Sequence, residues 1–350
     1  MARRPQARDE AASQHGGPAG GDVGAGYPYP LFEDGDFAVP SLYLSAEDGE
    51  RLLAHVGSEV EVRIVAERIH PGGVTKIVET RHGLIMAAAG MASVGMRPVT
   101  YSIASFATCR CFEQLKLAVA YAQLPVIVVG AGGGYAYSSS GVTHHAGEDI
   151  SLLCALPGMT VVAPGDPQEA ASLLPQMHSA GRCGYFRIGR GKEPACRSII
   201  EPVLGKARLM QHGRGVAVLS TGEIASEVQA ALDELRRRGV VPSWYQYHTI
   251  KPLDCQTLDA IAQRVQTIVV VEEHLAHGGL AAQVSNHFAS RPSHPALIAL
   301  NTGDGFVLGS PHKDEFRRNA GLCAASIAEA VMGIWKEPQA AHRAGSTASA

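Results

Sequence analysis

Histidine and arginine residues stand in short polar stretches that follow apolar runs of the sequence. Thr143-His144-His145 comes after a loop of glycine and serine, and Arg190 lies in Gly189-Arg190-Gly191-Lys192, directly after GYFRI (184–188). Adjacent histidines diverge on a strand or a helix, and the sequence offers no convincing third ligand, so we predict no metal site in this chain. Polar groups in a cleft and ordinary surface histidines both remain open for this pair.

Glycine-rich stretches are the second candidate for chemistry. The glycines of 130–134 could cradle a phosphate, but no GxxxxGK[ST] motif is present, and a tight turn is the commoner role. Gly303-Asp304-Gly305 has the letters that open a diphosphate and magnesium motif, yet it follows the last predicted strand. The chain has no Gly-x-Ser-x-Gly elbow, so hydrolase chemistry is poorly supported.

Two series of strands alternating with helices must position these residues. Because the strands are continuous apolar runs separated by helical patterns, we predict an α/β fold of two doubly wound, mostly parallel-sheet domains. Asp166 is expected to cap a helix that begins at Pro167. The expected strands of the first series are 62–67, 97–102, 125–130, 159–163 and 184–188, with helices near 83–95, 112–122 and 147–155. The second series has strands at 215–221, 242–248, 267–273 and 296–300, with helices at 223–238 and 324–335 and after Asp254 and Gly278.

The chain divides by composition into two domains with a linker and two tails. We expect a disordered N-terminal tail and lead-in over 1–45, a first domain over 46–195, a linker over 196–207, a second domain over 208–336 and a disordered tail over 337–350. Ligands of parallel sheets bind outside the carboxyl ends of the strands. The loops at 103–108, 131–145, 164–166 and 189–192 are therefore the expected binding loops.

Composition narrows the class of protein. The chain has 350 residues, a net charge of −3 and 46% hydrophobic residues, so a sizeable core is expected and nothing electrostatic favours nucleic acid or an anionic membrane. The first ten residues have no apolar signal region, and no stretch approaches the roughly 20 apolar residues of a membrane span. Seven cysteines without a CxxC spacing indicate a reducing cytoplasm.

Three segments of the first half carry a resemblance to a known family. RPVTYSIASFATCRCFEQLKLAVAY, GVTHHAGEDISLLCALPGMTVVAPGDPQEA and GYFRIGRGKEP resemble the pyrimidine-binding domain of transketolases, particularly those split into two subunits. In the second half, GVAVLSTGEIASEVQAALDELRRRGVVPSWYQYHTIKPLD and VEEHLAHGGLAAQV resemble the transketolase C-terminal domain. Together they cover about four-fifths of the predicted folded region, in the family's order.

The resemblance implies thiamine diphosphate as cofactor and the transfer of a two-carbon ketol unit from a ketose to an aldehyde. In this family the diphosphate and Mg²⁺ bind a preceding domain with a GDG motif, which we expect on a partner chain, the N-terminal transketolase subunit. The assembly is then expected to be an α2β2 heterotetramer. The substrate would be a small sugar or ketose-like molecule.

Single residues take family roles by position. By the same resemblance, His144 faces the substrate near the reacting carbon, with His145 beside it, and Arg190 binds the substrate's far end. Arg110 and Gln114 match an RxxxQ pattern. The pocket for the cofactor's aminopyrimidine falls on Ile103, Phe106 and Cys109, followed by Arg110.

Departures from the family pattern concern the catalytic carboxylate and the sugar-binding loop. Counting back from Gly90 places Arg81 where the family has its catalytic glutamate, and Arg cannot accept the hydrogen bond that this role needs. We therefore predict Glu79, two residues earlier, as the carboxylate facing the pyrimidine, through a shift in the turn before the helix. Ser139-Ser140-Gly141 replaces an acidic EDG, Gly132 replaces an upstream histidine, and the usual DADL region is shortened or absent, which predicts a non-standard substrate.

Three functions remain open. The first is a catalytic small subunit of a two-component transketolase-like enzyme, and the second is a subunit of a thiamine enzyme that decarboxylates or dehydrogenates 2-oxo acids. The third is a non-catalytic partner that only completes the complex, and Arg81 is the residue that favours it.

Overall fold

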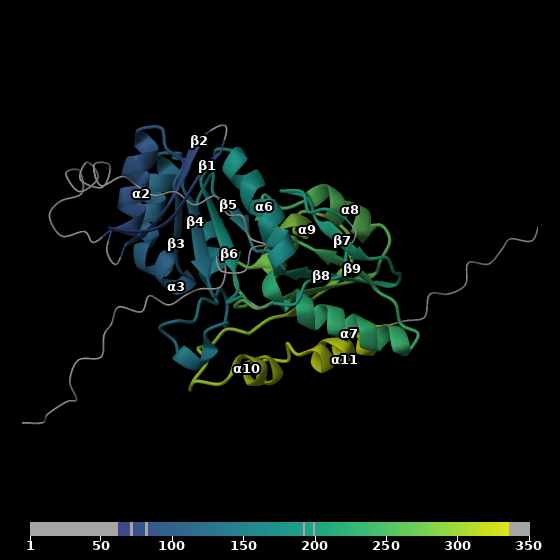
Figure 1. The fold of residues 1–350 in the computed structure, drawn as a ribbon. Coiled ribbons are helices and arrows are strands. Elements are labelled where there is room, and N and C mark those ends of the chain that lie inside the picture. Colours follow the sequence, from purple (N-terminus) through teal and green to yellow (C-terminus); the bar gives the residue numbers. More distant parts are fainter. Residues whose placement is uncertain (1–61, 71–72, 81–82, 192, 199, 336–350) are drawn as a thin grey trace, which may run out of the picture.

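The computed structural model describes residues 62–70, 73–80, 83–191, 193–198 and 200–335. The predicted tails at 1–45 and 337–350 lie outside the described residues. Two sheets lie side by side, each covered by helices (Figure 1).

The first sheet has the strand order β1-β2-β3-β4-β6-β5-β10. Strands β2, β3, β4, β6 and β5 run parallel, whereas β1 and β10 pair antiparallel at the two edges. The strands are β1 (Val62–His70), β2 (Gly73–Thr80), β3 (Val99–Ile103), β4 (Ile127–Ala131), β5 (Thr160–Val162), β6 (Gly184–Ile188) and β10 (Thr249–Lys251).

Both faces of the first sheet are buried. Helix α2 (Leu84–Ser93), the π-helix η2 (Leu115–Tyr121) and α5 (Asp149–Cys154) pack on one face, and α6 (Pro167–Ser179) packs on the other. Asp166 caps α6 as predicted, because its Oδ1 accepts the backbone N–H of Glu169 at 2.7 Å. Residues of β4 alternate between the two faces, as expected for a strand with helices on both sides.

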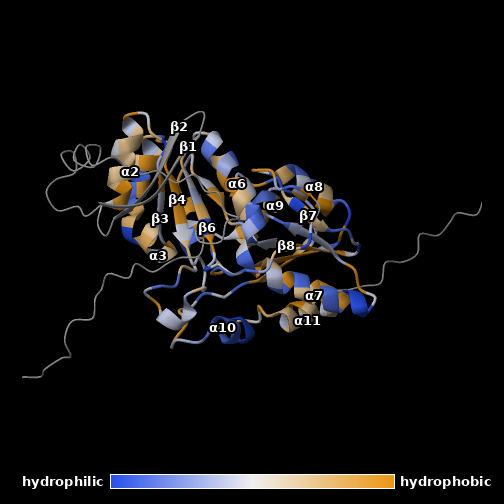
Figure 2. Cartoon of the chain, viewed as in Figure 1, coloured by the Kyte–Doolittle hydropathy of each residue, from blue (hydrophilic) through white to orange (hydrophobic). Residues whose placement is uncertain are grey.

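The second sheet has the order β12-β11-β8-β9-β7, with only β7 antiparallel. Helices α7 (Ala225–Arg237) and α11 (Ala324–Ile334) cover one face, and α8 (Cys255–Ala262) and α9 (Leu280–Phe288) cover the other. The apolar sides of these helices face the strands, while α10 (Lys313–Asn319) is strongly hydrophilic outside them (Figure 2). The strands are β7 (Arg208–Gln211), β8 (Val216–Thr221), β9 (Ser243–Gln246), β11 (Thr267–Glu272) and β12 (Ala296–Leu300).

The predicted fold class is confirmed, but several elements differ from expectation. Residues 73–80 form a strand paired with β1, where a turn was expected, and 242–248 is one short strand followed by β10, which joins the first sheet. The expected helix at 112–122 is α4 (Phe112–Gln114) followed by η2. Such edge strands and helix variants depend on tertiary pairing, which sequence periodicity does not report.

The domain boundaries stay a prediction. All seven cysteines lie among the described residues as free thiols. No helix in the described part of the chain is both long and apolar enough to cross a bilayer.

Candidate active site

Four adjacent parallel strands bring the predicted site residues to one edge of the first sheet. Strands β2, β3, β4 and β6 are neighbours in that order, and their carboxyl ends meet at the same edge. Glu79 lies near the end of β2, Phe106 follows β3, His144 follows β4 and Arg190 follows β6. The topology therefore supports the choice of these loops as the place for a ligand.

An aromatic contact joins the first two loops. The rings of Phe106 and His144 lie 5.2 Å apart between centroids, and the guanidinium of Arg110 lies 4.4 Å above the centre of the Phe106 ring. Ser105 Oγ donates to the Thr143 carbonyl oxygen at 3.1 Å, which ties the two loops together. The sequence separation of these pairs shows that only the fold creates this contact.

The predicted aminopyrimidine pocket lies on the short helix α3 (Ala104–Ala107) and the residues on either side of it. Ile103 and Phe106 are half-buried, while Cys109 is exposed. Thr108 Oγ1 donates to the Ala104 carbonyl oxygen at 2.7 Å and closes the turn below them. A half-buried aromatic ring beside an aliphatic side chain suits a flat heterocycle, so this part of the chain fits the aminopyrimidine.

A second contact joins His144 to Arg190 through a residue that the sequence analysis missed. The Tyr137 ring lies 6.2 Å from the His144 ring and 4.5 Å below the Arg190 guanidinium. Arg190 also donates to the Ala136 carbonyl oxygen at 3.5 Å. The only sequence signal for Tyr137 is an aromatic residue within a glycine and serine loop, which by itself predicts nothing.

His145 lies apart from this row. It is 6% exposed, its Nε2 donates to the Ser138 carbonyl oxygen at 3.1 Å, and its ring contacts that of Tyr135 at 5.1 Å. With Glu148 and the Gly303-Asp304-Gly305 loop it lines a separate cavity of about 250 Å³. Its predicted part in substrate binding stays a prediction.

The carboxylate prediction depends on a residue described only by its backbone. Glu79 is the penultimate residue of β2 and pairs with Arg63 of β1, and Arg81 lies outside the described residues. The assignment of Glu79 therefore stays a prediction. Within the described residues, no three His, Cys, Asp or Glu side chains group as a metal site requires.

Comparison with known proteins identifies the family. The model of the transketolase pyrimidine binding domain matches residues 76–192, and that of the transketolase C-terminal domain matches residues 205–308. One of the two subunits of the apulose-4-phosphate transketolase of Phocaeicola vulgatus is 31% identical over 64% of this chain and 72% of that protein. The chain belongs to the transketolase family.

Other relatives of this transketolase-family chain include the 6-deoxy-6-sulfo-D-fructose transketolase subunit SqwH of a Clostridium species, 34% identical over 61% of this chain and 66% of that protein. The chain spans only 40% of the 1-deoxy-D-xylulose-5-phosphate synthase of Chlorobium luteolum, at 32% identity. A solved structure titled as a split-gene transketolase, inactive beta4 tetramer, has a TM-score of 0.64 and 25% identity, over 73% of this chain and 81% of that one.

Buried charges connect the two domains of this transketolase-family chain beneath the site. Arg187 of β6 lies 3.4 Å from Asp149 and donates to the Glu273 carbonyl oxygen at 2.8 Å. The Glu273 carboxylate accepts the Tyr135 N–H at 2.9 Å and pairs with Arg317 of α10 at 2.7 Å. Because unpaired buried charges are costly, this chain of contacts fixes the Tyr135 loop against the second domain.

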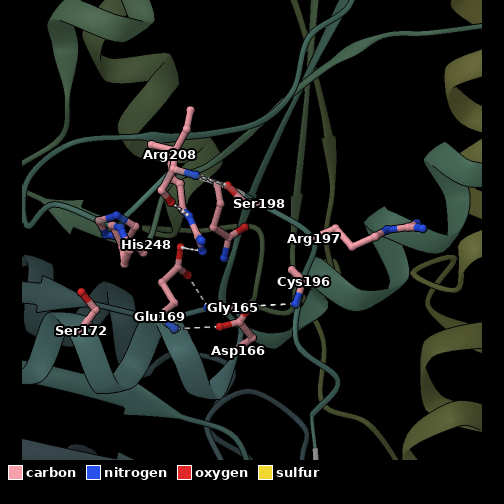
Figure 3. A network of polar contacts seen from close by, with 12 residues as sticks. Gly165, Asp166, Glu169, Ser172, Cys196, Arg197, Ser198, Arg208 and His248 are labelled. Atoms are coloured by element: carbon pink, nitrogen blue, oxygen red, sulfur yellow. Dashed lines mark hydrogen bonds and ion pairs between the residues drawn. The ribbon is translucent and has the colours of Figure 1, made fainter.

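A further network holds the linker against the first domain (Figure 3). Asp166 Oδ2 accepts the Cys196 N–H at 2.8 Å, and Glu169 accepts the Gly165 N–H at 2.7 Å and lies 3.4 Å from Arg208. Burial raises the pKa of Glu169 to about 7, against the opposing effects of the Gly165 hydrogen bond and the Arg208 charge. The sequence predicted the cap but not this buried pair, because its partner comes from β7.

Two histidines in the second domain are kept neutral by burial. Burial lowers the pKa of His248 to about 4 and that of His274 to about 4. The His274 Nδ1 donates to the Leu275 carbonyl oxygen at 2.8 Å, and its Nε2 accepts the Ser151 N–H at 3.3 Å. Only the neutral ring can serve both partners, so His274 connects the domains as a neutral group.

Proposed function

We propose that this chain is the C-terminal subunit of a two-component, thiamine diphosphate-dependent enzyme that transfers a two-carbon ketol unit from a ketose to an aldehyde. The row of Phe106, His144, Tyr137 and Arg190 at the carboxyl edge of the first sheet carries the proposal. It supplies an aromatic surface, a hydrogen-bonding imidazole and a cation in sequence along one edge. Relatives named as subunits acting on apulose 4-phosphate and on a sulfofructose support a non-standard sugar substrate.

Each side chain has one task in this proposal. Thiamine diphosphate, when bound, supplies the electron sink for cleaving a carbon–carbon bond next to a carbonyl. Ile103, Phe106, Cys109 and Arg110 would hold its aminopyrimidine, and the carboxylate of Glu79 would accept a hydrogen bond from the pyrimidine ring nitrogen. His144 would bind the substrate near the reacting carbon, and Arg190 would bind its anionic end.

The diphosphate and Mg²⁺ are assigned to an N-terminal partner subunit with a GDG motif, in an α2β2 heterotetramer. Relatives that are named as single subunits of a transketolase, and the structure titled as an inactive beta4 tetramer, support a requirement for a second kind of chain. We place the complex in the cytoplasm, as the free cysteines favour a reducing compartment.

Calorimetry with thiamine diphosphate and Mg²⁺ tests the assignment. The chain alone is expected to give little heat, because most of the cofactor's charge lies on the diphosphate, and binding should appear once the GDG-containing partner is added. The complex should then transfer a ketol unit from a ketose phosphate to an aldehyde. Micromolar cofactor binding by this chain alone would contradict the split, and light scattering that shows a monomer beside the partner would contradict α2β2.

A non-catalytic partner is the second candidate, because the sequence places Arg81 where the family has its glutamate. Substitution of both Glu79 and Arg81 separates the two. If neither Glu79→Gln nor Arg81→Ala changes the turnover of the complex, its catalytic carboxylate belongs to another chain. Turnover of a 2-oxo acid without ketol transfer would instead favour the decarboxylase alternative.

A further inference from the structure

Tyr137 occupies a central place in the site although no role was predicted for it. Its side chain is 6% exposed, and its ring lies between two candidate substrate-binding groups, His144 and Arg190. The Arg190 guanidinium lies 4.5 Å above the ring centre. A cation that stacks on a buried aromatic face is held in a narrow range of positions.

Gly132 makes room for this ring. Its φ is +67°, and a Cβ on it would clash with the Tyr137 Cδ2 and Cε2 atoms. The Gly132 N–H also donates to the Gly189 carbonyl oxygen at 3.2 Å, beside Arg190. Tyr137 therefore takes the space of any side chain at position 132 and brings an aromatic face to the Arg190 loop.

The loop that carries Tyr137 is itself rigidly placed. The Gly133 N–H donates to the Ile188 carbonyl oxygen at 3.0 Å, the Tyr135 N–H donates to the buried Glu273 carboxylate, and the Ser140 N–H donates to the Tyr137 carbonyl oxygen at 2.8 Å. The Arg190 backbone N–H donates to Glu193 Oε1 at 3.0 Å. The long Arg190 side chain, which is exposed, thus rests on a fixed platform.

We infer that Tyr137 is a positioning residue that sets the preference of the enzyme for substrates with an anionic end. It holds the Arg190 guanidinium in place before the substrate arrives, so that less side-chain freedom is lost when a phosphate or sulfonate binds. The group to be recognised is a tetrahedral oxyanion at the end of a short aldehyde or ketose. This inference rests on the proposed function, in which Arg190 binds that end.

Steady-state kinetics of the complex with its GDG-containing partner test the inference. The two acceptors are D-glyceraldehyde 3-phosphate and D-glyceraldehyde, which differ only in the anion. Tyr137→Leu should raise the KM for the phosphorylated acceptor about 3- to 30-fold, the range of a cation–π contact, with kcat changed less than threefold. The KM for the uncharged acceptor should stay the same, and Tyr137→Phe, which retains the ring, should restore the wild-type ratio.

Two comparisons separate positioning from a structural effect. Tyr135→Leu removes another buried ring of the same loop, one that stacks on Phe316 rather than under Arg190, and should leave the ratio of the two KM values unchanged. In an Arg190→Met background, Tyr137→Leu should have no further effect on that ratio. Equal KM ratios in wild type and Tyr137→Leu, or additive effects of Tyr137→Leu and Arg190→Met, overturn the inference.

A binding measurement keeps this test apart from that of the proposed function. If the wild-type complex transfers no ketol unit, the proposed function fails, and inorganic phosphate is then titrated into the same complex by calorimetry. Phosphate binding that weakens at least threefold in both Tyr137→Leu and Arg190→Met, but not in Tyr137→Phe, supports the inference. Phosphate binding that is absent from the wild type or unchanged in Tyr137→Leu overturns it.

Discussion

Replacement of Arg317 by methionine should destabilise the protein strongly. The Arg317 side chain is 5% exposed and lies 2.7 Å from Glu273, 3.5 Å from Glu223 and 3.5 Å from Glu227. The Glu273 and Glu223 side chains are only 3% and 8% exposed, so water cannot replace the missing cation. Breaking a buried ion pair by removing one partner costs about 3–5 kcal/mol, and we expect a loss in this range.

Urea unfolding measures this loss. Trp244, 2% exposed in the second domain, is the fluorescent reporter. With a slope of about 3 kcal/mol per molar urea, the midpoint should fall by about 1–2 M. Arg318→Met, on the exposed side of the same helix, is the matched control and should change the midpoint little.

Coupling and pH sharpen the test. Arg317→Met combined with Glu273→Gln should cost less than the sum of the two changes, because the second removes a charge that the first leaves unpaired. The loss should also shrink as pH falls from 7 to 5, since the unpaired buried carboxylates then take up protons. A midpoint that falls no further in Arg317→Met than in Arg318→Met would refute the reasoning.

Three other substitutions test the fold and the site. Gly133→Ala should lower the free energy of unfolding by about 1–3 kcal/mol, because a Cβ there would overlap Arg187, whereas Gly90→Ala, with open space in a helix, should raise it by about 0.5–1 kcal/mol. The pKa of His274 is about 4 in the fold and 6.5 in the unfolded chain, so its contribution is lost as pH falls through this window; His274→Gln should flatten the pH dependence of denaturant unfolding there by up to about 3 kcal/mol. Glu79→Gln should lower the turnover of the complex about 10²-fold or more while calorimetric assembly with the partner stays normal; unchanged turnover would exclude Glu79 as the catalytic carboxylate.

The sequence was sufficient for features that depend on local chemistry. Apolar runs predicted the parallel strands β4, β8 and β11, and Asp166 followed by Pro167 and Glu169 predicted the start of α6. The order of strands and loops also placed Phe106, His144 and Arg190 at strand ends. These predictions succeeded because hydrophobic period and capping act over a few residues, whatever the rest of the chain does.

Elements that depend on distant partners were not predicted. Strand β10 has only three residues and exists because it pairs with β5, and β7 pairs antiparallel with β9. Helix α10 is hydrophilic and carries no apolar stripe, yet it is held by Arg317 and by Phe316 stacked on Tyr135. Short segments of this kind have too little local preference to be recognised without the surfaces on which they lie.

The same division holds within the site. The sequence by itself determined which loops could bind a ligand and which residue types they contain, because those follow from the alternation of strands and helices. Only the tertiary structure decided that Tyr137 lies between His144 and Arg190, and that His145 faces Tyr135 instead. The physical reason is that a glycine at 132, a carbonyl at 189 and a buried carboxylate at 273 jointly place this loop, and their contacts form only when strands far apart in the chain lie side by side.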